Sequence, residues 1–328
     1  MGNRVVVMCA CKAGSYRVSK GFTIIEMVVT IIIAAIMAAG IVTYIGDSVE
    51  GFSSTANRNR LASSGRTVID RVALELHNAV PNSIRVTNTV QPGGNQCLEM
   101  VPFLGATTYL DPSFTSSGSD QFEIVDFHPP LRMETPADLG EEEVYAVIYP
   151  INTAALYAGL ATVGPGPIVR VGKMRSTYDD DPAPPEDVCA ETAEDLDDLD
   201  ADDDGRTTVC LVDEDNDPVE FRFSRRSPVQ RMYLATQPVS FCVVDDKIYR
   251  YENYGFHSAQ CNPGTCLPDN AIEGRHLITD RLDNDGLDAF TLIEQSLRRN
   301  AIISLNLNFA DQGDVITLKH EVLMRNVP

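Results

Sequence analysis

The sequence predicts an α+β protein in which a long N-terminal helix carries an antiparallel, β-rich head. Three observations lead to this prediction. An uncharged apolar run spans residues 27–45, and an amphipathic helical pattern then continues to residue 80. After Pro81, short β-type runs are separated by Gly, Pro and Asp, without the helices that connect parallel strands.

The charge of the chain is strongly negative and unevenly distributed. Its 328 residues include 47 acidic and 26 basic side chains, which gives a net charge of −21. Residues 179–217 hold 18 of these acids and a single base, Arg206. We expect no nucleic-acid partner, because binding by counterion release needs a basic face that neutralises phosphates.

The apolar run predicts a helix that crosses the inner membrane once. At about 1.5 Å per residue, such a run spans a hydrocarbon core of about 30 Å. The segment before it is basic and contains no acid, so the positive-inside rule keeps this end in the cytoplasm and exports the chain from Asp47 onward to the periplasm. The basic residues are Arg4, Lys12, Arg17 and Lys20.

Residues 20–27, with the sequence Lys-Gly-Phe-Thr-Ile-Ile-Glu-Met, lead into the apolar run. They resemble the class III signal of type IV pilins and type II secretion pseudopilins. The resemblance implies cleavage between Gly21 and Phe22 by a prepilin peptidase, followed by N-methylation of Phe22 and delivery to the pilus at the cell surface. It assigns Thr23 and Glu26 to filament assembly, with other major and minor pilins and an inner-membrane assembly platform as partners.

Glu26 is an acid among apolar residues, and a carboxylate in the membrane core costs about 2.5–3.5 kcal/mol on insertion scales. After cleavage it would lie one helical turn from the amine of Phe22. In a filament, the carboxylate of one subunit can meet the amine of its neighbour. Because an unpaired buried charge is strongly unfavourable, this pairing would select the axial register of the subunits.

These features divide the chain into a cleaved leader (residues 1–21), a transmembrane helix (22–52), an amphipathic continuation (53–81) and a β-rich periplasmic head (82–328). Translation could start at Met1 or at Met8. A lipoprotein signal at Cys9 or Cys11 is disfavoured, because the apolar run before them is too short. The expected strands are residues 83–90, 97–103, 121–127, 144–151, 219–224, 239–244, 247–251, 301–309 and 314–323.

Six cysteines come after the leader, and an even number in an exported domain indicates disulfides. One pair encloses a tight loop, a second pair brackets the acidic segment, and the remaining two would pair with each other. A zinc site is the alternative, but no Cys-x-x-Cys pair or nearby histidine cluster supports it. The candidate pairs are Cys261 with Cys266, Cys189 with Cys210, and Cys97 with Cys242.

The acidic segment (residues 179–217) contains a partial match to a calcium-binding EF-hand loop. Asp200, Asp202 and Asp204 are candidate Ca²⁺ ligands, but the twelfth position is Leu211 where the loop needs Glu. We therefore expect a solvated, mobile loop. Its residues 191–208 should be dispensable for folding if Cys189 pairs with Cys210, because that bridge would close the loop at its base. No other cofactor is expected. The sequence has no nucleophile elbow, phosphate-binding loop or dinucleotide fingerprint, so an enzyme is not expected.

Further stretches carry a narrower resemblance. Residues 40–52 and 79–86, and the Cys242 strand with residues 249–256, are similar to minor pilins of the mannose-sensitive haemagglutinin (MSHA) pilus, in the J-type pseudopilin group. The resemblance implies a minor pilin that takes part in pilus assembly and initiation, in a complex at the filament tip. Two alternatives stay open: a J-type pseudopilin of a type II secretion system, and a calcium-dependent tip adhesin.

Overall fold

The structure is a computed structural model that describes residues 21–87, 95–115, 117–127, 143–158, 164–178, 189, 203–284, 286–293 and 301–324, without the side chains of residues 175–178, 203 and 204. Residues 1–20, and with them the leader before Gly21, lie outside the described residues. So do Asp200 and Asp202. The chain divides into two compact units, residues 1–56 and residues 57–328.

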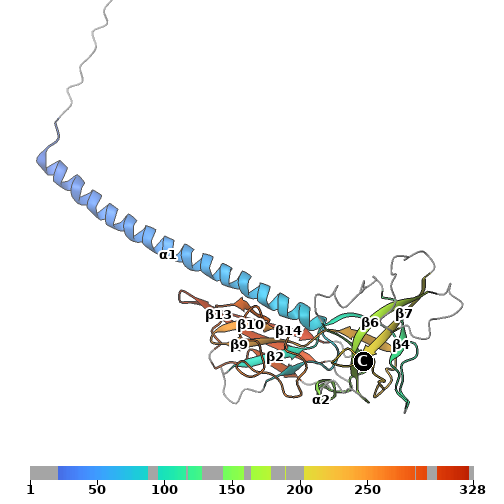
Figure 1. Ribbon diagram of the computed structural model, residues 1–328. Coiled ribbons are helices and arrows are strands. Elements are labelled where there is room, and N and C mark those ends of the chain that lie inside the picture. The colour runs from blue at the N-terminus through green and yellow to red at the C-terminus, as the bar shows by residue number, and fades with distance from the viewer. Residues whose placement is uncertain are drawn as a thin grey trace, which may run out of the picture. The chain divides into compact units, whose positions relative to one another are not determined.

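Helix α1 (Ile24–His77) is continuous through three glycines of its first half, Gly40, Gly46 and Gly51. It ends at His77, before the predicted end at Val80 (Figure 1). The reason lies in backbone pairing with the next segment. The Val80 N–H donates to the Val101 carbonyl at 2.8 Å, and the Phe103 N–H donates to the Asn78 carbonyl at 2.9 Å.

The described strands of the second unit form three antiparallel sheets, so the predicted α+β class is confirmed. The first has the order β1 (Arg85–Val86), β2 (Gln96–Met100), β9 (Val239–Val244), β10 (Lys247–Tyr251) and β11 (Arg275–Thr279). The second has the order β12 (Phe290–Ile293), β13 (Ile302–Asp311) and β14 (Asp314–Leu323). The third has the order β3 (Phe103–Thr108), β8 (Arg231–Ala235), β5 (Val144–Ile148), β6 (Ile168–Tyr178), β7 (Asp203–Val212) and β4 (Gln121–Val125). A short helix, α2 (Thr153–Tyr157), is capped by the side chain of Asn152.

Two expectations about strands are wrong. Residues 219–224 form only isolated bridges, among them Ser119 with Phe221, instead of a strand. Residues 203–212 of the acidic segment form β7, between β6 and β4, in place of the expected loop. Deletion of residues 191–208 would remove the first part of this strand, so dispensability stays a prediction only for residues 191–202.

The acidic segment contains a strand because its charges are concentrated before and after an apolar stretch. Val209 and Leu211 are buried in the core of the third sheet, and the backbone of Thr208 pairs with Glu123 and Arg175 on the neighbouring strands. Five consecutive residues, Thr208 to Val212, are buried because β7 has neighbouring strands on both sides and is covered on both faces of the sheet. The local pattern of charges does not indicate such neighbours.

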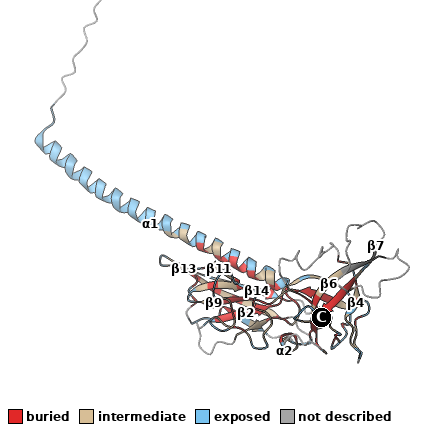
Figure 2. Cartoon of the chain, viewed as in Figure 1, coloured by how far each residue is buried: buried red, intermediate tan, exposed pale blue. Residues whose placement is uncertain are grey.

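The core beneath α1 joins the helix to the first and second sheets. Its helical stripe packs with alternate residues of β13, including Leu305 and Phe309. The buried positions of α1 are confined to its second half (Figure 2). Between these sheets, the side chain of Gln96 binds both backbone groups of Phe290, at 2.7 Å and 2.9 Å. This one amide therefore continues the hydrogen-bonding pattern of β2 onto the edge of β12. The helical stripe consists of Leu61, Val68, Ile69, Val72 and Leu76.

Candidate processing and assembly site

The N-terminal turn of α1 is built by Thr23, which occupies the N-cap position. The backbone N–H of Glu26 donates to the Thr23 hydroxyl at 3.3 Å and to its carbonyl at 3.1 Å. Thr-Ile-Ile-Glu is the T-x-x-E pattern of a capping box, in which the acid at the third helical position also complements the helix dipole. Thr23 thus caps the helix through its hydroxyl, and filament assembly stays the role expected for Glu26 from the sequence.

Gly21 has no packing role in the structure. A Cβ added to it would meet nothing within 4 Å, and the following Phe22 is 72% exposed. The fold therefore gives no reason for a glycine at this position. A residue without a side chain is compatible with the expected cleavage, in which the backbone would have to enter the active site of a peptidase.

The first half of α1 exposes its apolar side chains. Its most apolar window has a mean hydropathy of 2.6 and is not buried by any part of the described chain, and by length and composition this helix could cross a membrane. Two of its threonine hydroxyls are satisfied within the helix: Thr30 donates to the Met27 carbonyl and Thr43 to the Ala39 carbonyl, both at 2.9 Å. Such internal bonding makes polar side chains tolerable in lipid.

Three disulfides join the six cysteines that follow α1, in the pairs that the spacing favoured. Cys97 and Cys242 are directly opposite each other on β2 and β9, so their bridge crosses the middle of the first sheet. The other two pairs are Cys189 with Cys210 and Cys261 with Cys266.

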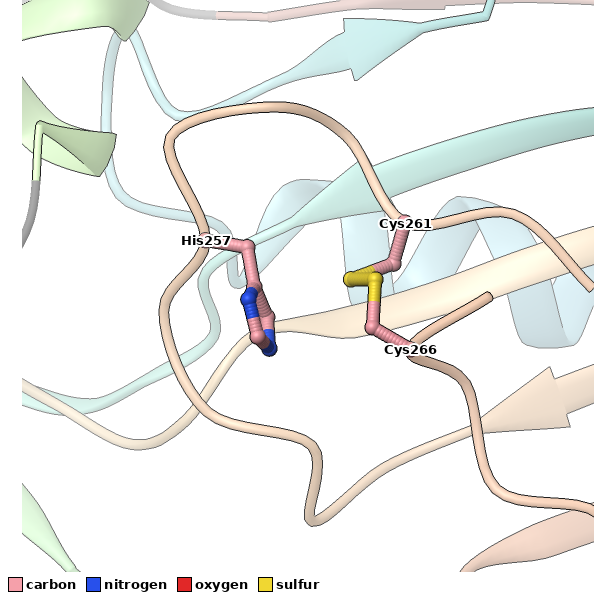
Figure 3. Close-up of side chains that lie close together, drawn as sticks. All are labelled: His257, Cys261 and Cys266. Carbon is pink, nitrogen blue, oxygen red and sulfur yellow. A yellow bond between two sulfur atoms is a disulfide. The ribbon is translucent and has the colours of Figure 1, made fainter.

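The structure also brings together a group that sequence spacing did not indicate. His257 lies beside the disulfide of Cys261 and Cys266, and the three potential ligand atoms are within 4.8 Å of one another (Figure 3). In this oxidised state the two sulfurs are bonded to each other and are not thiolates. The spacing His-x₃-Cys-x₄-Cys was the only available signal, and it is weak.

The candidate calcium ligands stay a prediction. Asp200 and Asp202 lie outside the described residues, and so does the side chain of Asp204. Leu211, at the twelfth position of the EF-hand match, is buried in β7. Three further aspartates, Asp213, Asp215 and Asp217, come after this match. The Asp213 carboxylate accepts hydrogen bonds from the backbone N–H groups of Asp215 at 2.9 Å and Asp217 at 3.0 Å, so it stabilises its own turn.

Two stretches that carry the narrower resemblance meet around a buried ion pair. Arg85 on β1 binds the fully buried Glu99 on β2 through two bonds of 2.7 Å and 3.0 Å. Its other donors reach the carbonyls of His257 and Ser258, and Tyr254 donates to Glu99 at 3.3 Å. Burial raises the pKa of Glu99, although Arg85 opposes the shift. These motif residues therefore join the loop after β10 to the first sheet.

Comparison with known families identifies one match. Residues 16–42 match the family described as Prokaryotic N-terminal methylation motif. No curated protein and no solved structure matches the chain. The matched segment contains the end of the leader, the expected cleavage position and the capped start of α1. Together with the exposed apolar helix and the antiparallel head, this motif supports the placement of the chain among the type IV pilins and pseudopilins.

Proposed function

We propose that the chain is a minor pilin of an MSHA-like type IV pilus, a structural subunit that takes part in pilus assembly and initiation at the filament tip. The observation that carries this proposal is the methylation motif at residues 16–42, which overlaps the first part of a helix whose most apolar window is not buried by the described chain. Such a helix needs lipid before assembly and the helices of other subunits afterwards.

The order of membrane insertion, folding and cleavage follows from the basic leader and from the exposed backbone at Gly21. The basic leader holds the N-terminus in the cytoplasm, and the head folds in the periplasm, where disulfides form. The prepilin peptidase then cuts between Gly21 and Phe22 and methylates the new amine. Other pilins and the inner-membrane assembly platform receive the processed subunit.

Cleavage is tested by replacing Gly21 with leucine. Because a side chain there meets nothing within 4 Å, the variant should fold and insert normally but stay uncut. Gly40→Leu is the matched control, since Gly40 is also free of neighbours within 4 Å but lies outside the cleavage site. Mass spectrometry of the N-terminus decides the result. A sheared pilus fraction in which the wild-type protein begins before Phe22 would contradict the proposal.

The two roles of Glu26 are separated by two substitutions. Gln preserves a capping-box residue but removes the charge, whereas Val removes both. If the carboxylate pairs with the amine of a neighbouring subunit, Glu26→Gln and Glu26→Val should both insert in the membrane and both be missing from filaments. Incorporation of Glu26→Gln at the wild-type level would show that Glu26 serves only the helix cap.

A J-type pseudopilin would carry the same motif and the same helix. The two functions separate when the gene is deleted, because a minor pilin is needed for surface pili and a pseudopilin for secretion of exoproteins. Piliated mutant cells that fail to secrete would overturn the pilus proposal while leaving processing at Gly21 intact.

A further inference from the structure

The disulfide between Cys261 and Cys266 closes the shortest loop of the three and has one partly exposed cysteine. Cys97 and Cys242 are both fully buried, whereas Cys266 is partly exposed beside a buried Cys261, as Cys189 is beside a buried Cys210. The bond spans a sequence separation of 5, against 21 and 145 for the others. The shortest loop restricts the unfolded chain least, so its loss should disturb folding least, and an exposed sulfur can be attacked by an external thiolate.

The loop between these cysteines is closed by hydrogen bonds as well as by the disulfide. The Thr265 N–H donates to the Asn262 carbonyl at 3.0 Å, and the Asn262 N–H donates to the Thr265 hydroxyl at 3.0 Å. Gly264 adopts a φ of +83°, which suits the turn. These bonds do not depend on the disulfide, so the two thiols should stay close together after reduction.

His257 is held beside the sulfurs by its surroundings. Its Nε2 lies 2.7 Å from the Tyr254 carbonyl, which can only accept, so Nε2 is the donor in this contact and Nδ1 is the nitrogen left to bind a metal. The ring stacks on that of Tyr254, and the His257 carbonyl accepts a bond of 2.8 Å from Arg85. A second ring nitrogen bonded to a backbone carbonyl is the usual support of a metal-binding histidine.

We propose that reduction of the Cys261–Cys266 disulfide opens a Zn²⁺ site formed by two thiolates and the imidazole of His257. The three ligand atoms already lie within 4.8 Å of one another (Figure 3). Zinc–ligand bonds of about 2.0–2.3 Å require the two sulfurs, now bonded to each other, to move apart after reduction and the imidazole to approach them. Two thiolates and one imidazole satisfy three positions of a tetrahedral ion and leave the fourth open.

The chemistry balances with a dithiol as the reductant. Its thiolate attacks the exposed Cys266 sulfur, forms a mixed disulfide and expels Cys261 as a thiolate. The second thiol of the reductant then attacks its own sulfur in the mixed disulfide and releases Cys266. Two electrons and two protons pass to the protein, and the reductant leaves as a disulfide. Zn²⁺ then displaces the two thiol protons.

The test uses the full-length protein in detergent and Co²⁺ as a spectroscopic probe. Dithiothreitol is added until two additional thiols per chain are titrated, and is then removed by gel filtration. The reduced protein should bind one Co²⁺ with thiolate charge-transfer absorption, which an equimolar amount of Zn²⁺ abolishes. The oxidised protein should not show this absorption.

Three variants decide the ligand set. His257→Ala should keep the two additional thiols but weaken Co²⁺ binding by more than the ~10–100-fold cost of losing an outer-shell partner. His276→Ala, at an exposed histidine of β11, is the matched control and should bind as the wild type does. Reduced wild-type protein that binds no more Co²⁺ than a Cys261→Ser/Cys266→Ser variant would overturn the proposal. Wild-type affinity in His257→Ala, or collapse of the tyrosine circular dichroism on reduction, would do so as well.

Discussion

The two halves of helix α1 differ in where their apolar side chains find partners. In the first half, Ile36 is 68% exposed and Phe52 is 78% exposed. In the second half, Leu61, Val72 and Leu76 are completely buried in the core beneath the helix. The apolar side chains of the first half are thus left without partners in the described chain. Those of the second half are part of the hydrophobic core of the head.

This difference separates assembly from stability along one helix. Burial of an apolar side chain contributes to folding only where the chain itself excludes water, as it does around the second half. Changes in the first half should therefore affect membrane insertion and filament formation. Changes in the second half should affect the free energy of unfolding of the second unit.

The largest expected effect is that of Leu76→Ala. Loss of a fully buried leucine should lower the free energy of unfolding by about 2–5 kcal/mol, because it leaves a cavity in the core shared with β13. Ile36→Ala, in the exposed half, should change it by less than about 0.5 kcal/mol. Urea unfolding in detergent, followed by the circular dichroism of the buried tyrosines, measures both. Equal effects of the two substitutions would remove the distinction between the halves.

A matched pair of glycines sharpens the comparison. A Cβ on Gly65 would lie 2.5 Å from Cδ1 of Leu318 and 2.8 Å from Cε2 of Phe309, so Gly65→Ala should cost about 1–3 kcal/mol. A Cβ on Gly51 meets nothing within 4 Å, and alanine is the better helix former, so Gly51→Ala should not destabilise. The same urea experiment tests both, and a neutral Gly65→Ala would mean that Leu318 moves aside at no cost.

The smallest expected effect concerns the polar attachment of the second half. Glu75 of α1 binds Arg250 of β10 at 3.1 Å, and Arg250 also contacts Glu252, whose other oxygen is 2.9 Å from His276. Burial alone would raise the pKa of Glu252, but its hydrogen bond to Arg250, with the charges of Arg250 and His276, lowers it overall.

A lowered pKa in the folded state means that the unfolded chain binds protons more readily. The stability contributed by Glu252 is therefore present above the ordinary glutamate pKa of about 4.3 and is lost as the pH falls through the lower folded value. Glu252→Gln should make the unfolding midpoint less dependent on pH below about 5. If the unfolding midpoint of the variant depends on pH in the same way as that of the wild type, another group is responsible for the loss of stability in acid.

Much of the processing site was accessible to sequence reasoning because it depends on neighbours in the chain. The glycine before the cut, the acid one turn later and the apolar run are local patterns, and the T-x-x-E cap can be read from the same residues. The spacing of the cysteines suggested the disulfide pairs. Two pairs close local loops, and the third pair consists of the two cysteines left over. Glu99 was missed, because its partners Arg85 and Tyr254 come from distant parts of the chain.

The sequence by itself therefore determined the helix, its capped start, its apolar half and the antiparallel character of the head. Tertiary structure alone decided that residues 203–212 enter a sheet, that Gln96 joins two sheets through Phe290, and that His257 lies beside a disulfide. The physical reason is the sequence separation over which each interaction acts. Periodicity and capping act within a few residues, whereas strand pairing and buried polar contacts depend on which distant groups exclude water together.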